Sequence, residues 1–442
     1  MRSETESFEI INSALDAANA DEADAVFISS DSGITRFANS NIHQNMSEIG
    51  ADLTLRVFID GAMGVASTTS LEQDDITEMA AVAREAAKHS LPLPSFAGLY
   101  RGGEDIPQLP TFQGASPAPA EKARALRTMF DRGREAGVQF AGSYSTGTSS
   151  VACGNSHGVH RYCVMSTSEA IVIAMRSDQS GFATDISRRG VDIPYLGNIA
   201  IEKATLRRDE EQQLEPGEYD AIIEPPAIAE VMEWMAIIAF SGQAYDDGSS
   251  FFVGNLGKRI VDPKLTIADD ALDPDFLPFP FDMEGLPKRR VALIERGVAR
   301  TPVVDKIYAD RLGIPPTANG WAPGSADHGM PLHLSIAAGD STREDLIRST
   351  KRGIWVTRFN YVNGLLEPKS ALMTGTTRDG TFLIRDGEVV ARLPNLRWTQ
   401  SMVEAFSRIE GLTRERGRAG TWSNPFGGTI APAMKIRGWN FG

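Results

Sequence analysis

The sequence predicts an α+β protein in which N-terminal α/β layered domains precede a larger β-rich C-terminal domain. Three observations lead to this class. The chain has 442 residues, and single hydrophobic cores usually stop growing near about 250 to 300 residues. Segments with helical and strand periodicity alternate in the first half, whereas strand patterns dominate the second. We therefore predict three domains, at residues 1–115, 116–215 and 216–442.

The first domain is predicted to begin and end with a helix, with strands between. Phe8, Ile11 and Leu15 recur at helical spacing, and Asp60 and Gly61 stand between two strand-like segments, which is typical of a tight hairpin. A stretch rich in Pro, Gly and Ser then marks the first boundary at residues 91–119. The expected elements are a helix at 5–20, short strands at 25–29, 35–38 and 52–59, and a helix at 74–88.

The second domain repeats this alternation of helix and strand. Its expected elements are a helix at 120–136, strands at 149–154, 160–166 and 170–176, and a helix at 198–209. A short sequence echo links residues 39–43 with residues 155–160. Two matches of this length do not establish an internal repeat.

The third domain begins with a strand and one apolar helix and is then mostly β. Pro226 suits the first turn of this helix. The expected elements are a strand at 219–224, the helix at 225–240, hairpins at 291–300 and 381–391, and helices at 341–352 and 400–408.

Composition excludes several classes of protein. The formal net charge is −14, which disfavours nucleic-acid binding because phosphate contacts need clustered Lys and Arg. Two cysteines leave no disulfide framework, and no apolar run approaches the roughly 20 residues of a membrane span. The first residues are too polar and acidic for a signal peptide. We expect a soluble cytoplasmic protein.

Several segments resemble, in this order, the TldD/PmbA family, the so-called modulators of DNA gyrase, over nearly the whole chain from about residue 25 to 442. They are residues 32–45, 53–67, 249–251, 265–270 and 353–356. In the TldD branch of that family, a helix carries His-Glu-x-x-x-His, and a cysteine near the C-terminus completes a zinc site. The resemblance thus implies a metallopeptidase-related fold.

The zinc motif itself is degenerate in this sequence. Laid on the helix at 225–240 without gaps, its positions fall on Glu233, Trp234 and Ile238, and the last cysteine is Cys163. A zinc hydrolase needs about three protein ligands and usually a carboxylate base. The chain therefore resembles the PmbA (TldE) branch, and we expect no catalytic residue and no metal in this chain, with zinc in a TldD-like partner.

One segment contains all the clustered Cys and His residues, Cys153, His157, His160 and Cys163. It reads as a hairpin, either in a register that puts the cysteines on opposite faces or in one that separates them by about 13 Å. A metal site is the alternative. The tip also matches Gly-x-Ser-x-Gly around Ser156, but a hydrolase nucleophile elbow requires a helix after the turn, and strand alternation follows here.

Four further residues are candidates for contacts with a substrate or with the reaction chamber. His328 and His333 flank a Gly- and Pro-rich stretch, and loops on a rigid scaffold often line sites. In the family this region borders the active-site chamber. Asp246 and Asp247 are paired acids, of a kind that serves acid/base chemistry or cation binding; solvated turn acids are the other interpretation.

The resemblance implies a non-catalytic subunit that pairs with a TldD-like zinc subunit to degrade or mature unfolded or short peptides. A stand-alone homodimer that binds peptides without hydrolysis is the alternative. A third hypothesis is a self-sufficient hydrolase that uses Ser156 or an unrecognised metal set.

Overall fold

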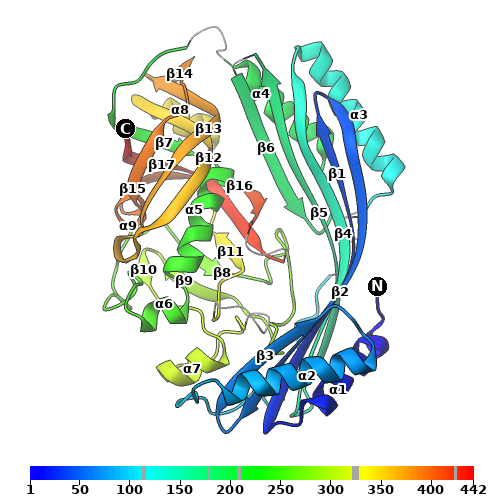
Figure 1. The fold of residues 1–442 in the computed structure, drawn as a ribbon. Coiled ribbons are helices and arrows are strands. Elements are labelled where there is room, and N and C mark those ends of the chain that lie inside the picture. The colour runs from blue at the N-terminus through cyan, green and yellow to red at the C-terminus, as the bar shows by residue number, and fades with distance from the viewer. Residues whose placement is uncertain (111–115, 178, 207–210, 321–327, 423–425) are drawn as a thin grey trace.

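A computed structural model describes residues 1–110, 116–177, 179–206, 211–320, 328–422 and 426–442. The strands within these residues form one six-stranded and one eleven-stranded sheet. In Figure 1 the smaller sheet and its helices lie beside the C-terminal unit, with strand β6 and helix α5 turned toward the junction. Helices and mixed sheets confirm the predicted α+β class.

The N-terminal half consists of two successive sets of elements with the same order, helix, three strands, helix. The first set is α1 (Glu4–Ala18), β1 (Glu22–Ala38), β2 (Asn41–Ile59), β3 (Ala62–Thr68) and α2 (Gln73–Lys88). The second is α3 (Pro119–Ala136), β4 (Gln139–Asn155), β5 (His160–Arg176), β6 (Gln179–Ser187) and α4 (Ile193–Thr205).

The two sets share one antiparallel sheet with the order β3-β2-β1-β4-β5-β6. Strands β1 and β4 pair at its centre, so segments from both predicted N-terminal domains form a single layer. The echo seen in the sequence lies at equivalent places, because Asn39 is in the β1–β2 turn and Asn155 is at the β4–β5 turn. The element order therefore repeats where the sequence hardly does.

The long strands differ from the short ones that the sequence predicts. Strand β1 has 17 residues and β2 has 19. Their middle parts carry exposed polar side chains such as Asp31 and Ser32, which hide the alternation of apolar residues. Backbone pairing nevertheless continues on both sides, since Ser32 pairs with Glu48 of β2 and with Gly147 of β4. An alternation of apolar and polar residues marks only the part of a strand that is buried on one face. In β1 and β2 the backbone pairing extends beyond that part.

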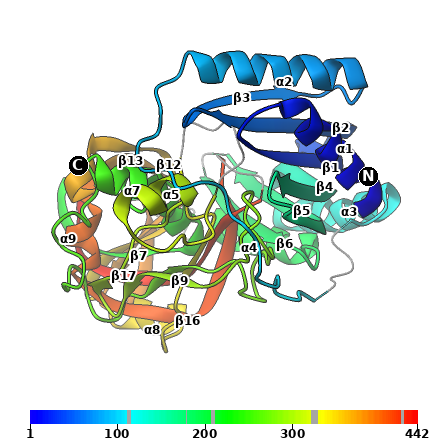
Figure 2. The ribbon, with the colours of Figure 1, turned by 90° about the horizontal axis from the view of Figure 1, so that it is seen from below.

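Each end of this sheet has its own helix pair and core. Helices α1 and α2 cover one end, where Ile11, Phe27 and Met79 share a cluster. Figure 2 shows α2 running along β3 on the outside of the sheet. Helices α3 and α4 cover the other end, where Phe130 and Phe140 belong to a second cluster.

The C-terminal half is mostly β, as predicted. Its helices are α5 (Pro225–Ile238), α6 (Gly242–Asp246), α7 (Lys306–Leu312), α8 (Arg343–Arg348), the 3-10 helix η1 (Pro368–Ser370) and α9 (Met402–Phe406). Its first strands are β7 (Gly217–Ile223), β8 (Ile267–Asp269), β9 (Val291–Glu295), β10 (Val298–Ala299) and β11 (His333–Ile336). Its later strands are β12 (Arg352–Glu367), β13 (Leu372–Arg385), β14 (Glu388–Arg392), β15 (Arg397–Ser401), β16 (Ile409–Gly420) and β17 (Gly428–Phe441).

Strand β7 pairs with both β12 and β17, so β7, β12, β13, β15 and β17 close into a ring. Aromatic rings of Phe359, Trp398 and Trp439 pack within it, with centroids 4.6 to 5.5 Å apart. Helix α5 packs against β12, β16 and β17. The position of α5 is thus set by its packing against strands of this ring.

Several helix predictions need correction. Helix α4 begins at Ile193, five residues before the predicted start at residue 198, because the Asp192 side chain caps it by accepting from the Tyr195 N–H at 2.9 Å. The predicted end at 207–209 lies outside the described residues. Helices α8 and α9 are shorter than predicted, and α6 and α7 were not predicted. In the described part of the chain, no helix is both long and apolar enough to cross a membrane.

Candidate functional site

The three residues to which the zinc motif was aligned lie on α5, beside a cavity of about 300 Å³ between the two sheets. Glu224 precedes the helix, and Pro225 and Pro226 occupy its first turn, where their missing N–H groups have no helical partner in any case. The cavity is lined by Glu169 and Ile171 of β5, Phe182 and Thr184 of β6, Pro226, Ala229, Glu230 and Glu233 of α5, Arg358 of β12, and residues 419–422.

The three motif positions are occupied by side chains that pack. Glu233 is buried, and one of its carboxylate oxygens accepts the backbone N–H of Trp422 at 3.3 Å. The Trp234 ring packs against that of Trp422, with centroids 6.1 Å apart. Ile238 belongs to the main C-terminal core. Gly364 of β12 lies so close to the Trp234 ring that a Cβ atom there would come within 2.9 Å of it.

The cavity is acidic, and its partly buried cation, Arg358, is already paired. Burial raises the pKa of Glu169 and that of Glu230, the latter helped by the nearby charge of Glu233. Burial lowers the pKa of Arg358, whose Nε lies 2.9 Å from Oδ2 of Asp379. These carboxyl groups can accept hydrogen bonds or hold a proton. In the part of the chain that the structure describes, no group of three His, Cys, Asp or Glu side chains is placed to hold a metal ion.

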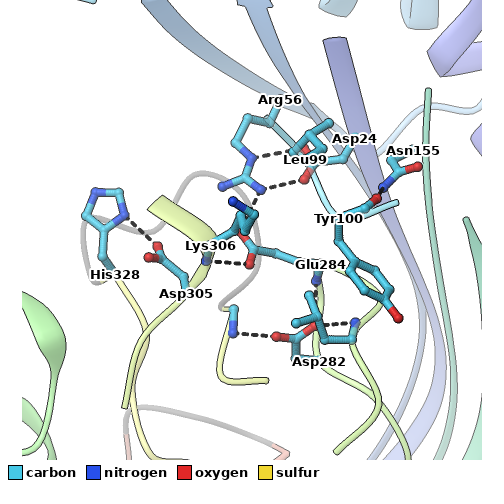
Figure 3. A network of polar contacts seen from close by, with 12 residues as sticks. Asp24, Arg56, Leu99, Tyr100, Asn155, Asp282, Glu284, Asp305, Lys306 and His328 are labelled. Atoms are coloured by element: carbon cyan, nitrogen blue, oxygen red, sulfur yellow. Dashed lines mark hydrogen bonds and ion pairs between the residues drawn. The ribbon is translucent and has the colours of Figure 1, made fainter. Parts of the chain in front are cut away.

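A second polar network joins the N-terminal sheet to the loops around α7 (Figure 3). The buried Arg56 guanidinium of β2 donates to both oxygens of Asp24 on β1, at 2.9 and 2.5 Å, and to Glu284 at 2.8 Å. The other Glu284 oxygen accepts the N–H of Lys306 at 2.9 Å. Two carboxyl groups thus share one arginine in the interior.

The predicted contact residue His328 lies at the margin of this network (Figure 3). Its Nδ1 is 2.9 Å from Oδ2 of Asp305, and Asp305 also caps α7 by accepting the N–H of Tyr308 at 2.8 Å. The rings of His328 and Tyr308 are 5.2 Å apart. The side chain remains partly exposed, so a role in substrate contact stays a prediction. The rest of the predicted loop, 321–327, lies outside the described residues.

None of the four predicted contact residues lines the α5 cavity. His333 is completely buried in β11 beside Phe276 and Phe279, and burial lowers its pKa to about 3. It is therefore neutral, and a substrate contact would require it to leave the core. Asp246 and Asp247 lie at the end of α6, and Asp246 is 2.6 Å from Arg311 of α7.

The segment with clustered Cys and His residues is a hairpin, as expected, but in a third register. Cys163 pairs with Val151, so it lies two residues along the sheet from Cys153 and on the same face. Both cysteines are free. His157 instead contacts Glu22 at 2.5 Å. Ser156 is in a turn between two strands, where its Oγ accepts the N–H of Ala23 at 3.2 Å, and no nucleophile elbow forms.

Sequence reasoning missed the residues that give the two polar clusters their character. Arg56 stands inside a strand between Leu55 and Val57, which is a weak signal of a buried charge, whereas Arg358 stands between Thr357 and Phe359. Glu169 lies within β5, in the gap between the two strands predicted at 160–166 and 170–176. No neighbouring residue in the sequence marks Glu230 or Glu284 as part of a polar cluster. The cations that face them, Arg358 and Arg56, are more than 100 residues away in the chain.

The longest match to a protein-family profile covers the C-terminal half of the chain. Residues 216–442 match the profile described as PmbA/TldA metallopeptidase C-terminal domain, and residues 23–87 match domain 1 of the same description. The chain belongs to the PmbA/TldD family. The resemblance stated from the sequence is confirmed.

Curated relatives of this PmbA/TldD chain carry metalloprotease names. A metalloprotease TldD homolog from Haemophilus influenzae is 29% identical over 164 residues, which cover 36% of this chain and 33% of the relative. A metalloprotease from Archaeoglobus fulgidus is 33% identical over 169 residues, covering 37% and 38%. One from Methanothermobacter thermautotrophicus is 23% identical over 225 residues, covering 50% and 48%. The matched regions span a third to a half of these relatives.

Solved structures match over nearly the full length. TldE from Thermococcus kodakarensis superposes with a TM-score of 0.87 at 21% identity, covering 99% of this chain and 100% of that one. A candidate modulator of a DNA gyrase from Thermotoga maritima gives 0.85 at 19% identity, covering 98% and 100%. At these identities the likeness shows the PmbA/TldD fold.

Proposed function

We propose that this chain is the non-catalytic, TldE-like subunit of a cytoplasmic zinc metallopeptidase that degrades or matures unfolded peptides. A TldD-like subunit would supply the zinc and the catalytic carboxylate. This chain would supply a wall of the reaction chamber and the surface that holds the partner.

The packing of α5 is the observation that carries the proposal. Glu233 accepts a backbone N–H, Trp234 lies against Trp422, and Ile238 is buried in the core. A hydrolytic zinc site needs ligands that point into an open coordination position and a base beside it. Here the three side chains at the motif positions contribute to packing instead.

Apolar side chains exposed near α5 support the pairing. Trp422, Leu365 and Leu366 are exposed, and Gly364, next to Leu365, lies against the ring of Trp234. Exposed apolar side chains therefore occur on two sides of Trp234, at Trp422 and at the end of β12. Contiguous exposed apolar surface is typical of protein interaction sites.

The test is a reconstitution with a TldD-like protein that carries His-Glu-x-x-x-His. Metal content and cleavage of an unfolded model peptide are measured for each chain alone and for the mixture. We expect zinc only in the TldD-like chain, and peptide cleavage that depends on both. Stoichiometric zinc or chelator-sensitive cleavage by this chain alone would overturn the proposal.

The same surface also suits a second copy of this chain, which is the basis of the alternative function, a homodimer that binds peptides without hydrolysis. Light scattering on the mixed sample separates the two. A particle with one copy of each chain supports the subunit proposal, whereas a persistent homodimer that ignores the TldD-like protein favours the alternative. A Ser156→Ala variant tests the third hypothesis, because loss of cleavage by the isolated chain would support a serine hydrolase.

A further inference from the structure

A second cavity, of about 400 Å³, lies on the other side of the N-terminal sheet from the helices, between β5, the segment 106–110 and the loop at 278–280. Its walls are mostly apolar, with Met165, Phe279 and four prolines among them. Ligand sites commonly combine such walls with a few polar groups that fix orientation. The polar group that stands out here is Arg188.

Arg188 follows β6 and is 3% exposed. Its Nη1 donates to Oγ1 of Thr167. Its Nε and Nη2 have no hydrogen-bond partner among the described residues, although more than nine in ten buried polar groups normally have one. Two donors of a rigid, planar fork are thus left unused in a side chain that lines the cavity, and both donor atoms are themselves buried.

Among the described residues, no neighbouring group balances the charge of Arg188. The nearby Cys163 is a neutral thiol at pH 7, because burial raises its pKa to about 12. Burial also lowers the pKa of Arg188 to about 10, which still leaves it protonated. By contrast, Arg418 of β16 donates to both oxygens of Asp185, at 2.8 and 2.7 Å. Within the described residues, Arg188 has no carboxylate in ion-pair contact.

A buried cation without a counter-ion costs free energy of folding, and its retention beside a cavity indicates a ligand that supplies the missing charge. We propose that this cavity binds an organic monocarboxylate with an apolar body, held by two parallel hydrogen bonds from Nε and Nη2 of Arg188 once the buried guanidinium turns toward the cavity. A guanidinium matches a carboxylate in this bidentate manner. The apolar walls and the lack of a second cation disfavour a phosphate, which carries more charge.

Calorimetry on the full chain with N-acetyl-leucine, N-acetyl-phenylalanine and the corresponding amides tests this site. We expect the carboxylates to bind, and the uncharged amides to bind about tenfold more weakly or not at all, because a charge-assisted bidentate contact is lost. Arg188→Met should weaken carboxylate binding at least as much. Arg188→Lys keeps the positive charge but lacks the planar guanidinium. Its affinity for the carboxylates should lie between those of the wild type and Arg188→Met.

Arg418→Met is the matched control, since it removes a paired arginine of the same region. It should keep the carboxylate affinity within about twofold while lowering the melting temperature. Without ligand, Arg188→Met should melt no lower than the wild type, because it removes an uncompensated buried charge. Equal binding of acids and amides, unchanged binding by Arg188→Met, or no binding of either acid at millimolar concentration would overturn the proposal. Binding of inorganic phosphate that requires Arg188 would also overturn the assignment to an organic carboxylate.

Discussion

At the residue scale, Arg56 shows how a single cation can organise the contact between distant segments. Its bidentate pairing with Asp24 already balances its charge, so Glu284 is a second carboxyl group on the same arginine. Burial raises the pKa of Glu284 to about 8, helped by the charges of Asp305 and Asp282 and opposed by Arg56. The group formed by Arg56, Asp24 and Glu284 is therefore neutral only while Glu284 holds a proton.

This predicts a loss of stability in alkaline solution. The pKa of Glu284 is higher in the folded chain than its ordinary value of 4.5, so between these two values the folded state binds the extra proton. The free energy of unfolding must then fall as pH rises toward 8. The loss should be on the order of 2 kcal/mol between pH 6 and pH 8, measured by urea denaturation.

Replacing the carboxyl group isolates this effect. Glu284→Gln should shift stability by a constant amount but flatten its dependence on pH, because the titrating proton is gone. Glu295→Gln, at a half-exposed surface pair with Arg300, should keep the wild-type slope. If Glu284→Gln and the wild type show the same slope from pH 6 to pH 8, another group is responsible.

At the element scale, the two helix–strand–helix sets pack in the same way through a glycine on each edge strand. A Cβ atom on Gly64 of β3 would lie 2.0 Å from the Ala83 carbonyl oxygen of α2, and one on Gly181 of β6 would lie 2.2 Å from that of Ala200 on α4. Such distances lie far inside van der Waals contact. Each helix therefore approaches its strand as closely as a missing side chain permits.

We expect Gly64→Ala and Gly181→Ala each to destabilise the chain by about 1 to 3 kcal/mol or more, since overpacking forces the helix away from the sheet. Thermal unfolding followed by circular dichroism measures this. Ser67→Ala, on an exposed side of β3, is the control and should stay within about 0.5 kcal/mol. A neutral result for both glycine variants would mean that the helices can shift without cost.

The sequence predicted the elements whose apolar pattern is strong, and missed those set by tertiary pairing. The amphipathic pattern of α1 and the apolar run of α5 were enough to locate them. The full lengths of β1 and β2 were not predictable, because pairing on both sides continues through their polar middle parts. The motif positions on α5 were placed from the sequence, whereas the cavity beside them needs Glu169 and Arg358 from remote strands.

At the scale of the whole molecule, the ring of C-terminal strands presents α5 toward the N-terminal sheet and extends β12 outward from it (Figure 1). The outer part of β12 carries Tyr361, 91% exposed, and Leu365, 61% exposed. Exposed apolar residues so close to a degenerate catalytic helix are explained if the partner subunit covers them. On this proposal the partner subunit both carries the zinc site that α5 lacks and covers the exposed apolar residues of β12.

This argument predicts that a charge on β12 breaks the assembly without unfolding the chain. Leu365→Asp should weaken binding to the TldD-like subunit by about tenfold or more, as expected for an apolar anchor in an interface. Leu91→Asp is the matched control, because Leu91 is 87% exposed and lies in the segment after α2. Both variants should melt near the wild-type temperature, and only the first should lose association in light scattering and cleavage in the reconstituted mixture. Equal association of both variants would place the interface elsewhere, and loss of self-association alone would assign this surface to a second copy of the chain.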